Sequence, residues 1–210
     1  MVLINKLIAR YPCLTECRDV IGNALTAIIH CYESGGKVLV CGNGGSSADA
    51  DHIVGELMKG FRKNRPLSEE LKRKIISTGG SVGEKMAQSL QAPLRAINLS
   101  AHIALNTAYS NDISAEFAFA QQVLGYGDDR DVLIGLSTSG NADNVIAAGV
   151  AAKAIGMSTI GLCGKPRCNM DGLFDYVVHA PETETHLVQE LHQPIYHALC
   201  ADVETHFFSE

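Results

Sequence analysis

The feature that most constrains this chain is an apolar strand that runs directly into a glycine-rich turn and then a helix. Residues 37–41 (Lys-Val-Leu-Val-Cys) are followed by Gly-Asn-Gly-Gly-Ser-Ser at positions 42–47. Glycine permits positive φ and close backbone approach, and serine caps a following helix. The free N–H groups at the start of such a helix attract anions such as phosphate. This stretch therefore predicts a buried strand, an anion-binding turn and a helix.

A second polar turn, Ser-Thr-Ser-Gly-Asn at 137–141, follows another predicted strand at 131–136. Ligands of open parallel sheets bind at the carboxyl ends of the strands, so two such turns indicate one shared site. Neither turn matches the glycine pattern of dinucleotide-binding proteins or the Gly-Lys-Ser/Thr of a P-loop. A small phosphorylated molecule is therefore a better candidate ligand than a nucleotide.

Predicted strands alternate with predicted helices along the chain, which is typical of parallel strands joined by right-handed crossovers. We expect one α/β domain over residues 1–210, a three-layer α/β/α sandwich with a central, mainly parallel, flavodoxin-like sheet. Residues 67–93 predict two short helices around a glycine turn, either a surface excursion or a lid. The remaining predicted strands are 94–99, 156–163 and 176–179, and the remaining helices are 1–10, 15–34, 103–108, 115–124, 142–155 and 185–208.

Composition narrows the class of protein. A net charge of −6 argues against a nucleic-acid-binding face, and no apolar run approaches the length of a membrane span. The seven cysteines are odd in number and scattered, which is typical of a reduced, cytoplasmic protein. The pairs Cys13/Cys17 and Cys163/Cys168 lack the two-residue gap of a zinc knuckle, so we expect packing rather than metal binding there. His30, His102, His179 and His206 are expected to be structural or surface residues.

The helix after the first turn carries His52 and Glu56, four residues apart and hence on one face. Such a pair is either a hydrogen bond at the edge of the core or part of a metal or catalytic site, and its position behind a glycine turn favours the second interpretation. Gln189, His192 and His197 mark a polar face of the last helix.

Taken together, these residues resemble the sugar isomerase (SIS) domain family and, more closely, the phosphoheptose isomerases. The resemblance rests on the glycine turn, His52 and Glu56, the Ser-Thr-Ser-Gly-Asn turn, Gln189 and His197, and it covers the chain apart from 67–93. It implies conversion of sedoheptulose 7-phosphate to D-glycero-D-manno-heptose 7-phosphate through an enediol, as a step toward heptose for lipopolysaccharide. It also implies a cytoplasmic homotetramer that contains zinc, with helices in residues 1–35 serving oligomer packing and active sites built between subunits.

The resemblance also assigns roles to residues. It implies a phosphate site and a sugar site, an acid/base pair of Glu56 and His197, and a zinc site formed by four side chains. The phosphate site comprises Ser137, Thr138 and Ser139; the sugar site Asn43, Gly44, Gly45 and Ser46, with further substrate contacts from Glu56, Asn111, Asp112 and Gln189; and the zinc site His52, Glu56, Gln189 and His197.

Three departures from the family pattern leave the sugar phosphate open: Ala142 stands in place of a serine, His186 of an aspartate and Gly60 of an arginine. The alternatives are an isomerase of another sugar phosphate, a non-catalytic phosphosugar sensor, or a module like the DnaA initiator-associating factors. A geometric difficulty also arises, because Gln189 and His197 are eight residues apart, or about 12 Å of helix rise. Either Pro194 bends the helix, or the two residues serve sites in different subunits.

Overall fold

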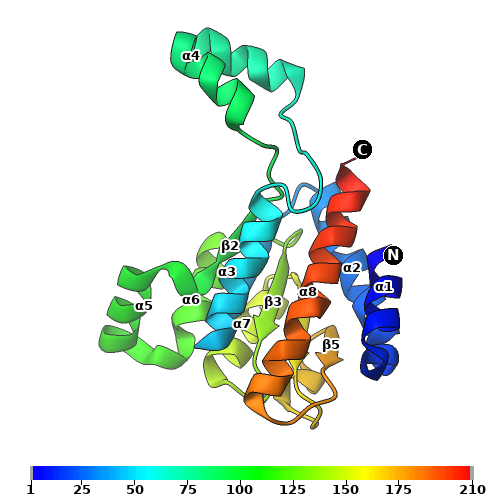
Figure 1. The fold of residues 1–210 in the computed structure, drawn as a ribbon. Helices are drawn as coiled ribbons and strands as arrows, with labels where there is room; N and C mark the ends of the chain where they lie inside the picture. The colour runs from blue at the N-terminus through cyan, green and yellow to red at the C-terminus, as the bar shows by residue number, and fades with distance from the viewer. Residues whose placement is uncertain (1, 209–210) are drawn as a thin grey trace.

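The computed structural model describes residues 2–208 and contains one five-stranded sheet (Figure 1). The strands are β1 (Val38–Gly42), β2 (Ala96–Asn98), β3 (Val132–Leu136), β4 (Ser158–Cys163) and β5 (Tyr176–His179). Every pairing is parallel, and the spatial order is β2-β1-β3-β4-β5. The order is that of flavodoxin-like sheets, which confirms the predicted fold class.

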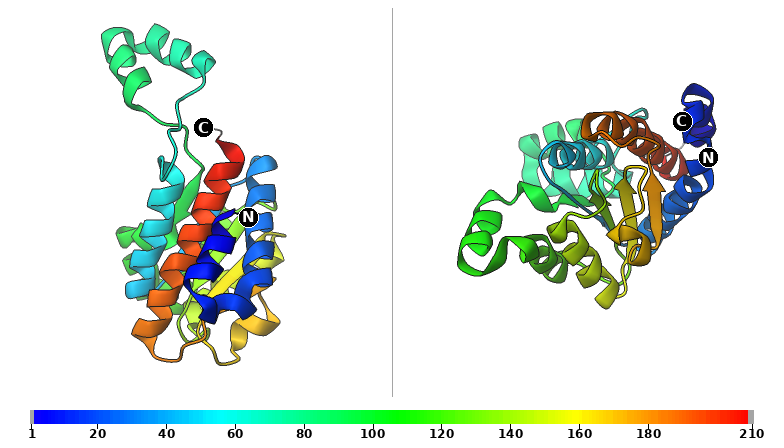
Figure 2. Two further views of the ribbon diagram at one scale, coloured as in Figure 1. Left: turned by 45° about the vertical axis from the view of Figure 1, so that its right-hand side comes forward. Right: turned by 90° about the horizontal axis from the view of Figure 1, so that it is seen from below.

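Helices cover both faces of this sheet (Figures 1 and 2). One layer contains α2 (Arg18–Glu33), α3 (Gly45–Met58) and α8 (Thr185–Phe207), with α1 (Val2–Arg10) packed outside them. The other contains α6 (Ala118–Tyr126) and α7 (Asp143–Ala154), with α5 (Ile103–Tyr109) beyond them, and α4 (Glu69–Ser89) lies outside both layers. Short 3-10 turns lie at Pro12–Cys17, Leu99–Ala101, Ala115–Phe117 and Asn169–Gly172, and a π-helical turn lies at Ser110–Ser114.

The central strands supply a core on each face of the sheet. All five residues of β1 are buried, and side chains alternate between faces along a strand. Val38 and Val40 therefore pack with α2, α3 and α8, whereas Leu39 and Cys41 pack with α6 and α7. Continuous burial of this kind explains why the strands are apolar runs without polar alternation.

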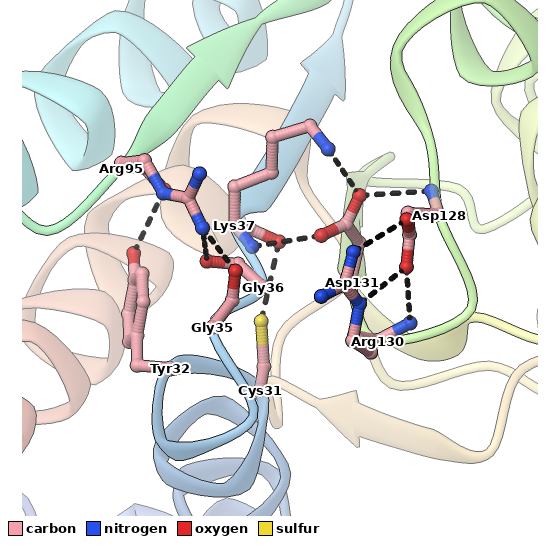
Figure 3. A network of polar contacts seen from close by, with 9 residues as sticks. All are labelled: Cys31, Tyr32, Gly35, Gly36, Lys37, Arg95, Asp128, Arg130 and Asp131. Atoms are coloured by element: carbon pink, nitrogen blue, oxygen red, sulfur yellow. Dashed lines mark hydrogen bonds and ion pairs between the residues drawn. The ribbon is translucent and has the colours of Figure 1, made fainter.

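A polar network ties together the amino ends of β2, β1 and β3, opposite the glycine turn (Figure 3). The buried carboxylate of Asp131 accepts hydrogen bonds from the backbone N–H of Lys37 at 2.8 Å and of Asp128 at 2.9 Å, and it pairs with the Lys37 ammonium group. The Arg95 guanidinium donates to the carbonyls of Gly35 and Gly36. These bonds hold the three strand starts in register, so the turns at the other ends of the strands are held in register too.

The segment predicted as two short helices around a glycine turn has that form. α4 reverses at Gly80, whose φ is +51°, and the resulting hairpin projects away from the sandwich (Figure 1). Its two stems meet in an antiparallel bridge between Pro66 and Gln91, and the Ala92 N–H donates to the Arg65 carbonyl at 2.7 Å. The single-domain assignment with an inserted excursion stays a prediction.

Within residues 2–208, no helix combines the length and apolar character that crossing a membrane requires.

Candidate functional site

The two polar turns lie side by side because their strands are neighbours. Gly42 at the end of β1 pairs with Leu136 at the end of β3. Beyond them, the side-chain amides of Asn43 and Asn144 exchange two hydrogen bonds, of 2.8 and 2.9 Å. The glycine turn is thereby joined to the first turn of α7, and both loops open at the carboxyl edge of the sheet, as expected for a shared ligand site.

The Ser-Thr-Ser turn forms a compact polar loop. The hydroxyl oxygens of Ser137 and Ser139 are 3.4 Å apart, and the Asn141 N–H donates to the Ser139 hydroxyl at 3.2 Å. Gly140 has φ of +67°, a left-handed conformation that favours glycine. Hydroxyls converging at the start of a helix suit a phosphate group.

Gln189 from α8 faces the glycine turn. A Cβ atom on Gly45 would lie only 2.6 Å from the Gln189 side-chain nitrogen, so this position has room for no side chain. Gly44 has φ of +55°, which allows the chain to enter α3. The structure thus brings the predicted sugar-binding turn and Gln189 together.

The predicted acid/base residues lie farther along the line where α3 packs against α8. His52 Nε2 is 3.2 Å from the Glu56 carboxylate and 3.3 Å from His197 Nε2. Glu56 is mostly buried, whereas the His52 side chain is 39% exposed, so the cluster is reachable from solvent. Burial and the neighbouring His52 together lower the pKa of His197, although Glu56 opposes the shift. His197 is therefore a neutral imidazole at neutral pH.

Two residues that the sequence analysis missed orient His52. The Tyr196 hydroxyl donates to Asp49 at 3.1 Å and lies 3.0 Å from His52 Nδ1. Burial and, to a smaller extent, the nearby Asp49 carboxylate raise the pKa of Tyr196. The tyrosine hydroxyl therefore stays protonated and donates to Asp49. We therefore assign Nδ1–H of His52 as the donor to the tyrosine oxygen. The lone pair of His52 Nε2 then faces Glu56 and His197.

Three of the four predicted zinc ligands lie near one another, and histidine and carboxylate side chains are zinc ligands. His52 Nε2 is 3.2 Å from the Glu56 carboxylate and 3.3 Å from His197 Nε2, but the ligand atoms of the three residues do not all lie within 4.8 Å of one another, so a shared ion would require side-chain rotation. Gln189 of the same chain does not fit, because it lies against Gly45, about 12 Å of helix rise from His197. α8 continues through Pro194 without bringing the two together.

The predicted substrate residues Asn111 and Asp112 lie apart from these groups. Both are exposed in the π-helical turn after α5, and the Asn111 amide donates to the Asp112 carboxylate at 2.9 Å. α5, which precedes this turn, lies beyond α6 and on the far side of α3 from α8 (Figure 1).

A buried ion pair supports the end of α3, and the sequence analysis did not anticipate it. Arg65 and Glu204 are both fully buried, with 2.7 Å between Arg65 Nε and the carboxylate. The guanidinium also donates to the backbone carbonyls of Leu57 at 2.7 Å and Glu56 at 3.1 Å. Arg65 thus caps the last turn of the helix that carries Glu56. The sequence signal was weak, since the partners are 139 residues apart.

His197 also borders a basic cleft of about 430 Å³ between α1, the segment after α3, and α8. The cleft is lined by Lys6, Arg10 and Arg62 together with the carboxylate of Glu190. Its positive side chains would favour an anionic substrate approaching His197.

A separate cluster gathers at the carboxyl end of β4, where packing was expected. Cys163, Cys168 and His179 each place a ligand atom within 4.8 Å of the others, and of the groups searched in residues 2–208 this one has metal-binding geometry. The sequence alone predicts a structural or surface role for His179 and packing roles for Cys163 and Cys168. The spacing along the chain does not reveal this cluster, because the histidine comes from β5, 11 residues after the second cysteine.

This parallel fold, with a serine-lined turn beside a glycine-rich turn, defines a protein of the sugar isomerase class. The sequence profile of the SIS domain matches residues 10–89 and 85–164. The chain is 36% identical over 194 residues to the phosphoheptose isomerase of Helicobacter pylori (strain P12), covering 92% of this chain and 88% of that protein. It is also 36% identical over 192 residues to the phosphoheptose isomerase of Clostridium acetobutylicum, covering 91% of this chain and 85% of that protein.

The chain belongs to the phosphoheptose isomerase family of SIS domain proteins, and it is a sugar-phosphate isomerase. Among solved structures it is similar to the phosphoheptose isomerase of Neisseria gonorrhoeae, with a TM-score of 0.73, 28% identity, and coverage of 97% of this chain and 92% of that one. The phosphoheptose isomerase of Francisella tularensis has a TM-score of 0.72 and 28% sequence identity, and the match covers 97% of this chain and 92% of that one. The expected enzyme class is confirmed, and the non-catalytic alternatives lose their support.

Proposed function

We propose that this chain converts sedoheptulose 7-phosphate to D-glycero-D-manno-heptose 7-phosphate. The observation that carries the proposal is that His52 lies 3.2 Å from Glu56 and 3.3 Å from His197 on α3 and α8, the two helices that also carry the glycine turn and Gln189. The names of the similar proteins support a heptose phosphate as substrate. Departures at Ala142, His186 and Gly60 leave an isomerase of another sugar phosphate as the competing candidate.

In this mechanism the Ser137–Ser139 turn binds the phosphate and the Asn43–Ser46 turn binds the sugar hydroxyls. Aldose–ketose isomerisation moves a proton between C1 and C2 through an enediol, which requires a base at carbon and an acid/base at oxygen. Glu56 serves as the base at carbon, because its carboxylate is mostly buried and lies beside the cluster. His197, whose pKa is lowered, takes and returns the hydroxyl proton as a neutral imidazole.

A zinc ion held by His52, Glu56 and His197 would supply Lewis-acid polarisation of the carbonyl oxygen. The residues also impose a constraint, because a carboxylate that binds metal strongly is a weaker base. We therefore propose that the Glu56 contact to metal is weak or changes when substrate binds.

We further propose that a complete site takes groups from more than one copy of the chain. The separation of Gln189 from His197 by about 12 Å, and the exposed position of Asn111 and Asp112, support this arrangement. It agrees with the homotetramer that the family resemblance implies. The cytoplasmic location and the role in heptose synthesis for lipopolysaccharide are part of the same proposal.

The deciding experiment is incubation with sedoheptulose 7-phosphate, with product formation followed by NMR. We expect turnover by the unaltered protein and its loss in Glu56→Gln and in His197→Ala, while circular dichroism shows an intact fold. Glu33→Gln, at a surface carboxylate that pairs with His206 away from the site, is the matched control and should keep turnover. No turnover alongside tight phosphosugar binding would refute the substrate, and near-normal turnover in either variant would refute the acid/base pair.

A further inference from the structure

We propose that Cys163, Cys168 and His179 form a structural site for a thiophilic divalent cation of the zinc type, separate from the cluster of His52, Glu56 and His197. The inference goes beyond the proposed function and does not depend on it. Cys163 ends β4, Cys168 lies in the loop that follows, and His179 ends β5, so the site joins two neighbouring strands.

Two of the three spacings between ligand atoms match those of a tetrahedral ion, and the third, between Cys168 and His179, is within 4.8 Å. With zinc–sulfur and zinc–nitrogen bonds of about 2.3 and 2.0–2.1 Å, a tetrahedron has edges of about 3.8 Å between two sulfurs and about 3.5 Å between sulfur and nitrogen. The Cys163 and Cys168 sulfurs are 3.8 Å apart, and Cys163 Sγ is 3.5 Å from His179 Nδ1. The four residues between the cysteines also lie within the range that zinc loops use.

An outer carboxylate orients the histidine in the way that metal sites require. Asp171 lies 2.6 Å from His179 Nε2, and the Cys168 N–H donates to the other oxygen of Asp171 at 2.8 Å. Because Nε2–H donates to the carboxylate, the Nδ1 lone pair of a neutral imidazole points at Cys163. Nδ1 is also 2.8 Å from the Gly164 carbonyl oxygen, so two lone pairs would face each other. A proton or a cation must lie between them, and the two sulfurs favour a cation.

Binding would be a ligand exchange without redox chemistry. The two thiols each lose a proton to solvent, and the ion gains two thiolates and one imidazole. A fourth ligand completes the tetrahedron, either the Gly164 carbonyl oxygen or a water molecule, because Cys168 is partly exposed.

The site would stabilise the phosphate-binding turn. The Gly164 N–H donates to the Thr138 carbonyl at 3.0 Å, and the Asn169 N–H donates to the Asn141 side chain at 2.8 Å. A Cβ atom on Gly140 would lie 2.2 Å from Cys168 Sγ, so loop and turn are in direct contact. An ion that holds the cysteine loop against the ends of β4 and β5 would therefore limit the motion of the turn.

Cobalt substitution of the full chain tests this site apart from the cluster of His52, Glu56 and His197. The side chains of that cluster contain no sulfur, so a thiolate-to-cobalt charge-transfer band reports only the cysteine site. We expect this band in the unaltered protein and its loss in Cys168→Ser, together with loss of about one bound zinc per chain by elemental analysis. Cys13→Ser, at an exposed cysteine outside the cluster, is the matched control and should keep both signals.

Thermal unfolding supplies a second readout. Chelation should lower the melting temperature of the unaltered protein and of Cys13→Ser by more than that of Cys168→Ser, which keeps only the ligands at His52, Glu56 and His197. A cobalt spectrum without a thiolate band, or equal zinc content in Cys168→Ser and the unaltered protein, would overturn the proposal. A Cys163–Cys168 disulfide detected by mass spectrometry in protein purified aerobically without chelator would overturn it too.

Discussion

Replacement of Glu204 by glutamine probes the buried support beneath the proposed base. The carboxylate accepts hydrogen bonds from the Phe61 and Arg62 N–H groups, both at 2.8 Å, and from Arg65 Nε at 2.7 Å. Burial acts to raise the pKa of Glu204, but these three donors outweigh it and lower the pKa, so the group is ionised in the fold. Glutamine keeps the shape but removes the charge, and its NH2 group would face N–H donors.

The expected cost is about 3–5 kcal/mol in the free energy of unfolding, the range for breaking a buried ion pair from one side. The loss of free energy of unfolding should lie at the upper end of this range, because Arg65 has no exposed surface through which water could solvate its charge. The loss should also reach Glu56, since Arg65 holds the backbone carbonyl of that residue. Turnover should therefore fall more than the fraction of unfolded protein explains.

Urea unfolding followed by circular dichroism measures the cost, at one protein concentration because association would shift the midpoint. Glu33→Gln is the control: Glu33 pairs with His206 on the surface, where such a pair contributes no more than about 1 kcal/mol. The double variant Arg65→Met/Glu204→Leu should recover part of the loss, because no buried charge remains unpaired. A cost below about 1 kcal/mol for Glu204→Gln would refute the argument that Arg65 depends on this carboxylate.

Three further predictions follow from other sites. Burial lowers the pKa of the fully buried His192 from 6.5 to about 4, so its contribution to stability should be constant above pH 6.5. That contribution should fall as the pH drops from 6.5 toward 4, where only the unfolded chain binds the proton. Urea unfolding of His192→Gln over this pH range should give a shallower slope than the unaltered protein, and equal slopes would contradict the prediction. Gly140→Ala should destabilise the protein by about 1–3 kcal/mol more than Gly44→Ala. Both glycines have positive φ, but only at Gly140 would the added methyl group collide with Cys168. Equal losses in urea unfolding would show that this crowding has no effect. Replacement of residues 68–89 by a short Gly-Ser linker should leave the melting temperature within a few degrees of the original, because the two stems of the hairpin pair at Pro66 and Gln91. The turnover of this variant decides whether the hairpin is a lid or a surface excursion. Collapse of the fold would show that the hairpin belongs to the core.

Local sequence determined much of the architecture. The apolar run before Gly42 predicts a strand buried on both faces, because only a sheet covered by helices on each side leaves no position for a polar residue. The residues of the two polar turns can also be identified locally, because glycine and serine at the end of a strand predict a turn. Gly80 likewise marks the reversal of α4, although a single sequence does not show that the hairpin projects from the body.

Tertiary structure decided which of these residues meet. Periodicity places His52 and Glu56 on one face of α3, but only the packing of α3 beside α8 sets His197 within 3.3 Å of His52 and leaves Gln189 at the glycine turn. The Arg65–Glu204 pair and the cluster of Cys163, Cys168 and His179 arise in the same way, from crossovers that join distant segments. Contacts between residues far apart in the chain depend on how whole elements pack, and that information is absent from the spacing of residues along any one of them.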